Sequence, residues 1–166
     1  MSRERLCYGP RVDRMRRAEL IERYRAGADA VDAALAGADD VELDAVPDDG
    51  GWTARMVVHH VADSESNSYL RVRKLLAEEE PLVQGYDEAE YARRLRYDRP
   101  VEASLAVFRA VRASTAELLD LLTDEEWQRA GIHSESGPYA MDDWLEIYAA
   151  HAIDHADQIR RARGGA

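Results

Sequence analysis

Histidines are the residues of this chain with the most chemistry to offer, and there are five of them: His59, His60, His133, His151 and His155. His151 and His155 are four residues apart, so on a helix their side chains would lie one above the other. Neutral imidazole is the commonest protein ligand for zinc and nickel. The spacing therefore permits binding of one divalent ion, although two histidines so spaced can equally be ordinary core or surface residues.

The neighbours of this pair favour the metal-binding interpretation. Trp144, Tyr148 and Ile159 recur with His151 and His155 at helical spacing, and such an apolar stripe normally faces a core. Two imidazoles buried side by side need partners for their ring nitrogens. A shared metal ion would satisfy one nitrogen on each ring.

A third ligand has to come from another helix, where the adjacent His59 and His60 are the candidates. They are rotated by about 100° from each other around a helix, and periodicity does not decide which one faces inward. Asp63 and Asn67 follow His60 by three and seven positions and share its face. They can orient a ligand or contact a metal-bound water, or they can simply be solvated polar residues.

Three histidines would leave positions open on the ion, which is typical of catalytic zinc, whereas structural zinc is usually closed by four protein ligands. We therefore predict one divalent metal ion per chain, zinc or nickel, at an enzymatic site. Such an ion lowers the pKa of a bound water towards neutrality, which would supply a nucleophile for hydrolysis. Asp63 is the predicted catalytic residue that orients this water.

Helical periodicity positions these residues on four long segments. The first runs from Asp13 to Leu35, and the second starts at the predicted N-cap Thr53 and ends before Pro81. The third begins at residues 98–100, with Asp98 as a predicted cap and a proline in the first turn, and continues to about residue 122. The fourth runs from about Asp142 to the glycines at 164 and 165.

Shorter elements are predicted between the long helices: a helix over 86–96 with Asp87 near its start, a single turn at 124–127, and a hairpin or loop over 132–139. Strand signals are otherwise nearly absent. We therefore predict an all-α fold, a four-helix bundle with short connecting helices, in which residues 1–166 form a single domain.

Composition narrows the range of partners and compartments. Hydrophobic residues make up 46% of the 166 residues, and 33 acidic against 22 basic residues give a net charge of −11. This charge disfavours nucleic acid and anionic membranes as partners. Because Cys7 is the single cysteine and Met1 to Pro10 do not have the pattern of a signal peptide, we expect a cytoplasmic protein.

Several short motifs resemble the DinB/YfiT-like superfamily and, within it, the YfiT-like candidate metal-dependent hydrolases. The similarity covers roughly residues 50 to 160. The matching residues occur in the family order, namely Gly-Gly-Trp-Thr at 50–53, Val-Val-His-His-Val-Ala-Asp-Ser at 57–64, Asn67-Ser68-Tyr69, Arg71, Tyr86-Asp87-Glu88 and the histidine pair 151 and 155.

The resemblance implies a ligand set of His60, His151 and His155, because the family uses the second histidine of its pair and the two histidines of its last helix. It also implies a substrate-side role for His133, since relatives carry a histidine before the last helix; a solvated loop histidine is the alternative. Asn67 is a further candidate substrate-binding residue. The chain departs from relatives that have histidine in place of Glu65.

Three functions remain open at this point. The preferred one is a metal-dependent hydrolase of an unidentified small molecule. The superfamily is also similar to S-transferases that use small thiols of the bacillithiol or mycothiol type, in which the metal would favour the thiolate. The third is a non-catalytic bundle that binds a metal or a partner protein. We also expect a homodimer, with a monomer as the alternative.

Overall fold

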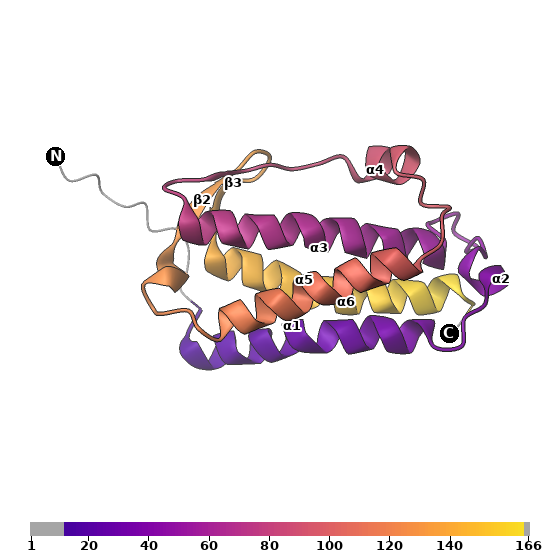
Figure 1. Ribbon diagram of the computed structural model, residues 1–166, viewed down its shortest axis with the longest axis horizontal. Helices are drawn as coiled ribbons and strands as arrows, with labels where there is room; N and C mark the ends of the chain where they lie inside the picture. Colours follow the sequence, from indigo (N-terminus) through magenta and orange to yellow (C-terminus); the bar gives the residue numbers. More distant parts are fainter. Residues whose placement is uncertain (1–11, 165–166) are drawn as a thin grey trace.

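The computed structural model describes residues 12–164, which form a bundle of four long helices (Figure 1). Cys7, the segment Met1 to Pro10 and Gly165 lie outside the described residues. The prediction of an all-α four-helix bundle is confirmed. The long helices are α1 (Arg14–Leu35), α3 (Ala54–Ala77), α5 (Glu102–Leu119) and α6 (Met141–Ala162).

The helices are arranged so that α1 packs against α6, α6 against α3, α3 against α5 and α5 against α1. Helices α3 and α5 run in the same direction, opposite to α1 and α6 (Figure 1). Two parallel neighbours need a connection that returns along the bundle, and residues 78–101 provide it. This crossover runs along α3 and carries the short helix α4 (Glu88–Arg94) near its end (Figure 1).

The remaining elements are short and lie at the two ends of the bundle. Helix α2 (Asp40–Leu43) joins α1 to α3, and the 3-10 turn η1 (Glu126–Gln128) follows α5. Strands β1 (Leu82–Val83), β2 (Ala130–His133) and β3 (Gly137–Ala140) form a sheet in the order β1-β2-β3. β1 is parallel to β2 and places Val83 opposite His133, whereas β2 and β3 form an antiparallel hairpin.

Side-chain caps fix the start of four of the helices. Each cap accepts a hydrogen bond from a backbone N–H three residues later: Asp13 from Arg16, Asp39 from Glu42, Thr53 from Met56 and Asp87 from Glu90. The predicted cap Asp98 is wrong, because α5 begins four residues later, after Val101, without a side-chain cap. Asp98 instead pairs with exposed Arg96. Helix α5 also ends at Leu119, three residues earlier than predicted.

The core consists of two apolar clusters, one toward each end of the bundle. Val31, Val61 and Phe108 belong to one cluster, and Tyr24, Leu75, Leu119 and Trp144 belong to the other. Between the clusters the inward-facing residues are small or polar, and each long helix contributes to this layer: the buried Gly27, Glu65 and Ser68, Arg112 and Thr115, and the partly buried His151. No helix in residues 12–164 is long and apolar enough to cross a membrane.

The approach of α1 to this layer requires a residue without a side chain. A Cβ at Gly27 would lie 2.6 Å from Nη2 of Arg112 and 2.8 Å from Cβ of Ala152. Both atoms belong to neighbouring helices, α5 and α6. Gly27 therefore allows α1 to pack closely against both of them.

We predict that Gly27→Ala destabilises the protein by about 1–3 kcal/mol, because overpacking outweighs the gain of about 1 kcal/mol that alanine normally brings to a helix interior. Urea unfolding followed by circular dichroism measures this. Asp29→Ala, at an exposed position of the same helix, is the control and should change the stability by less than about 0.5 kcal/mol. A Gly27→Ala variant as stable as the parent would contradict the packing argument.

Candidate metal centre

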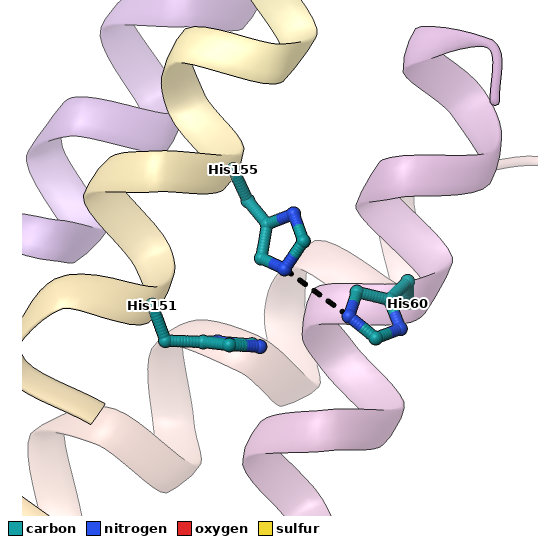
Figure 2. A group of neighbouring side chains, drawn as sticks. All are labelled: His60, His151 and His155. Atoms are coloured by element: carbon teal, nitrogen blue, oxygen red, sulfur yellow. Dashed lines mark hydrogen bonds between the residues drawn. The ribbon is translucent and has the colours of Figure 1, made fainter. Parts of the chain in front are cut away.

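Three histidine side chains from two antiparallel helices converge at the interface of α3 and α6 (Figure 2). One potential ligand atom from each of His60, His151 and His155 lies within 4.8 Å of the others. The Nε2 atoms of His60 and His155 are 3.2 Å apart. This separation is a hydrogen-bonding distance, and the group is compact enough for one ion to contact all three rings.

The hydrogen bonds of the two α6 histidines leave Nε2 available as a ligand atom. Nδ1 of His151 donates to Oε1 of Glu65 at 3.2 Å, and Nδ1 of His155 donates to Oε1 of Gln158 at 2.8 Å. Each ring then presents a lone pair at Nε2, which on His151 accepts from Ser64 Oγ at 3.2 Å. An acceptor behind Nδ1 is the usual support of a metal-ligating histidine.

Burial keeps His60 and His155 in the neutral form that a metal requires. His60 is 2% exposed, and its desolvation, together with the nearby His155 and His151, lowers its pKa to about 3. The pKa of His155 is lowered to about 4, first by burial and then by His151. Nδ1 of His60 is buried without a hydrogen-bond partner. The donor set thus suits a divalent cation better than it suits protons.

The structure distinguishes the two adjacent histidines that periodicity left open. His59 is fully buried and points to α5 and the end of the crossover. Its Nδ1 accepts from the Ser104 hydroxyl at 2.8 Å, and its Nε2 donates to the carbonyl of Arg99 at 2.9 Å. Both nitrogens have protein partners, so His59 helps to attach the crossover to α3.

Asp63 and Asn67 are not part of the three-histidine group. The Asp63 carboxylate accepts a hydrogen bond of 2.7 Å from the Tyr97 hydroxyl. Tyr97 packs edge-on against Trp52, which contacts the His60 ring in the same way, with ring centroids 5.1 Å apart. Asn67 donates to the Asp63 carbonyl within its own helix. Asp63 therefore reaches His60 through two aromatic rings.

His133 lies on β2 and is also outside the group. It is half-buried, its ring is 5.5 Å from that of Tyr139, and its Nδ1 accepts from the backbone of Glu135. Burial and then the nearby Arg71 lower its pKa. His133 is therefore associated with Tyr139 rather than with the other histidines.

Sequence reasoning missed several residues that support the site. Ser64 and Gln158 follow His60 and His155 by four and three positions, so helical spacing could have identified them. Glu65 was noticed only as a difference from relatives. It is five positions from His60, on another face of α3, and no local pattern links it to His151 on α6.

Comparison with known proteins agrees with this geometry. The chain belongs to the DinB superfamily, whose sequence pattern matches residues 23–159. It is 37% identical over 118 residues to a protein of Oceanobacillus iheyensis named as a candidate metal-dependent hydrolase, covering 71% of this chain and 69% of that one. YfiT of Bacillus subtilis, with a name of the same kind, is 34% identical over 131 residues, which cover 75% of this chain and 73% of YfiT.

The solved structure of Bacillus subtilis YfiT is similar over nearly the whole chain. The two structures superpose with a TM-score of 0.83 at 30% identity, covering 96% of this chain and 95% of YfiT. That protein is described as a candidate metal-dependent hydrolase with an unusual four-helix bundle topology. The parallel pair α3 and α5 and the crossover between them therefore belong to a known fold.

The lowered pKa values predict that the metal-free protein loses stability as the pH falls from about 6.5 towards 4. His60 and His155, with pKa values of about 3 and about 4, stay neutral in the folded state, whereas unfolded histidine protonates near 6.5. The unfolded state then binds more protons, and each histidine contributes a slope of up to about 1.4 kcal/mol per pH unit.

Urea unfolding of chelator-treated protein at pH 7.5, 6.0 and 5.0 measures the slope. His155→Asn removes one of the two titrating groups and should make the dependence shallower. His133→Asn, on the half-buried hairpin, serves as the control, with a smaller effect expected. Identical pH profiles for wild type and His155→Asn would show that burial does not hold His155 neutral.

Proposed function

We propose that this protein is a metal-dependent enzyme that binds one divalent ion, zinc or nickel, through His60, His151 and His155, and that it hydrolyses a small molecule. The convergence of three imidazoles within 4.8 Å is the observation that carries the proposal. The relatives named as metal-dependent hydrolases support it. With three protein ligands, coordination positions remain for a substrate or water, as in catalytic sites.

The protein's own groups would prepare the site for this chemistry. A bound divalent ion supplies Lewis-acid chemistry and a lowered pKa for water. Glu65, held by Arg112 Nη1 at 2.5 Å, fixes the orientation of the His151 ring. Ser64 Oγ lies beside His151 Nε2 and is placed to hydrogen-bond a ligand that approaches there. His151 has 15% of its side chain exposed, which indicates the side of access.

We assign Asp63 a positioning role in this proposal. Its carboxylate holds the Tyr97 hydroxyl, and Tyr97 and Trp52 together form the apolar side of His60. This aromatic packing keeps His60 away from bulk water, which strengthens its preference for a metal over a proton. A direct contact with substrate is not needed for Asp63 to affect the rate.

We predict about one zinc or nickel ion per chain in purified protein, and loss of most of it in His151→Ala. Elemental analysis after gel filtration measures this, with helical content checked by circular dichroism. His133→Ala is the matched control, because it removes a histidine outside the group and should leave the metal content unchanged. Equal metal content in wild type and His151→Ala would refute the proposed ligand set.

We predict turnover of an ester or amide without added thiol, lost on chelation and restored by zinc or nickel. A panel of small esters, amides and electrophile–thiol pairs, assayed with and without thiol, tests this. Turnover that requires a thiol would indicate a thiol transferase instead. A protein with full metal content and no turnover under either condition would support a non-catalytic metal-binding bundle.

A further inference from the structure

Beside His151 lies a group of hydrogen-bond donors that the proposed chemistry does not use. The group consists of Arg71 on α3, Tyr86 on the crossover, Tyr139 on β3 and Tyr148 on α6, and is called the donor cluster below. Arg71 Nη1 donates to the Tyr148 hydroxyl at 3.0 Å, and its Nη2 donates to the carbonyl of Gln84 at 2.8 Å. The hydrogen bonds of Arg71 therefore join the crossover to the bundle.

Three donors of the cluster are buried with no partner in good hydrogen-bond geometry: Nε of Arg71 and the hydroxyls of Tyr86 and Tyr139. Ser64 lies near the Tyr86 hydroxyl and Arg71 near the Tyr139 hydroxyl, and each interaction opposes the rise in that tyrosine's pKa. Tyr139 is only 5% exposed. Leaving such groups unpaired is costly, and native proteins rarely do so without a reason. Burial is the main cause that raises the pKa of both tyrosines, so their hydroxyls keep their protons and remain donors.

Arg71 also lacks a counter-ion. Among the ion pairs of residues 12–164, none involves Arg71, and its two hydrogen-bond acceptors are neutral oxygens. His133, which lies near Arg71, has a lowered pKa and is neutral at physiological pH. The cluster thus holds one cation that makes no ion pair, although the carboxylates of Glu65, Glu88 and Asp143 lie near its tyrosines.

The donor cluster adjoins His151. The Tyr148 ring lies 5.4 Å from that of His151, one turn away on α6. The Ser64 hydroxyl, which bonds His151 Nε2, is also close enough to the hydroxyls of Tyr86 and Tyr148 to affect their ionisation. A small molecule bound near His151 would have its far end among these donors.

We propose that the donor cluster binds a carboxylate of the substrate, so that the enzyme acts on small molecules that carry a carboxylate near the reacting group. This inference rests on the proposed function for the position of that reacting group. Arg71 Nε and the two tyrosine hydroxyls supply three donors, and a carboxylate accepts from several donors at once. One cation balances the single charge of a carboxylate, whereas a phosphate monoester would bring about two negative charges.

A purely structural role would not explain the tyrosine hydroxyls. If Tyr86 and Tyr139 only filled space, phenylalanine would fill it equally well without burying an unpaired polar atom. Binding sites commonly carry groups that weaken the fold in this way. The two interpretations therefore differ in what Tyr139→Phe does: the first predicts a neutral or stabilising change and nothing else, the second predicts a loss of ligand affinity as well.

The test uses mercaptoacetate, 3-mercaptopropionate and 4-mercaptobutyrate, each compared with its neutral amide. Protein loaded with cobalt reports binding through its absorption spectrum, because a thiol that enters the coordination shell changes it. We expect at least one acid to bind about tenfold more tightly than its amide, because hydrogen bonds to a charged group are stronger than those to a neutral one. The three acids differ in the distance between thiol and carboxylate, so that one of them can span from the metal to the donor cluster.

Variants of the donor cluster test whether these residues cause the preference for the acid over its amide. Tyr86→Phe, Tyr139→Phe and Arg71→Met should each reduce the ratio of acid to amide affinity toward one, with cobalt content unchanged. Tyr139→Phe should keep or raise the melting temperature, so lost preference there cannot be attributed to misfolding. Arg73→Met is the matched control: Arg73 is two residues away on α3, bonds Ser114 and Thr115 of α5, and should not affect the ratio.

The outcomes separate this proposal from the proposed function. If acids and amides both change the cobalt spectrum and bind with equal affinity, the carboxylate site is overturned and the metal site stands. Failure to bind cobalt would refute the metal site, and calorimetry of the acids and amides with the metal-free protein then decides the carboxylate site alone. A preference for the acid that survives Arg71→Met and Tyr139→Phe would also overturn it.

Discussion

The buried ion pair between Glu65 and Arg112 determines how closely the four long helices approach one another. Both side chains are almost fully inaccessible, and Oε1 of Glu65 lies 2.5 Å from Nη1 of Arg112. Removing two charges from water is expensive, so the pair needs precise geometry and further hydrogen bonds. Arg112 also donates a hydrogen bond to the Tyr24 carbonyl of α1, and its guanidinium stacks over the Tyr24 ring. Glu65 accepts a further hydrogen bond from His151.

Every long helix is therefore constrained at the same level of the bundle. Helix α1 contributes Gly27, because the Arg112 guanidinium occupies the space that a side chain would need there. Helices α3 and α5 contribute the charged side chains of Glu65 and Arg112, and α6 contributes His151. The apolar clusters on either side supply the stability that this layer lacks. Since the orientation of His151 depends on Glu65, the geometry of the candidate metal centre is coupled to the packing of the whole bundle.

The sequence predicts much of the fold because its signals are local. Caps such as Thr53 and the apolar stripes specify helices from a few neighbouring residues, and the pair 151 and 155 shares a helix face by spacing alone. Asp98 was misassigned because the residues before α5 carry an ordinary cap pattern although the helix begins later. Periodicity alone did not choose between His59 and His60. The family resemblance implied His60, and the position of α5, whose Ser104 satisfies His59, supplies the physical reason.

The parts that the sequence could not predict depend on contacts between distant segments. Glu65 and Arg112 are 47 residues apart, and nothing near either residue indicates a buried pair. The donor cluster draws on α3, the crossover, the hairpin and α6, so its members share no spacing pattern. Unpaired hydroxyls such as that of Tyr139 become informative only when burial is known, because an exposed tyrosine hydroxyl is satisfied by water.

The crossover between α3 and α5 has a consequence for how such proteins can diversify. It contributes Tyr86 to the donor cluster and the Gln84 carbonyl that accepts from Arg71, yet most of its residues lie outside the two apolar clusters. Doubling the length of a flexible connection costs only about 0.6 kcal/mol of closure entropy. Insertions and substitutions there can reshape what the site accepts while the bundle and its three histidines stay constant. One scaffold can in this way supply a lineage of binding sites with different specificities.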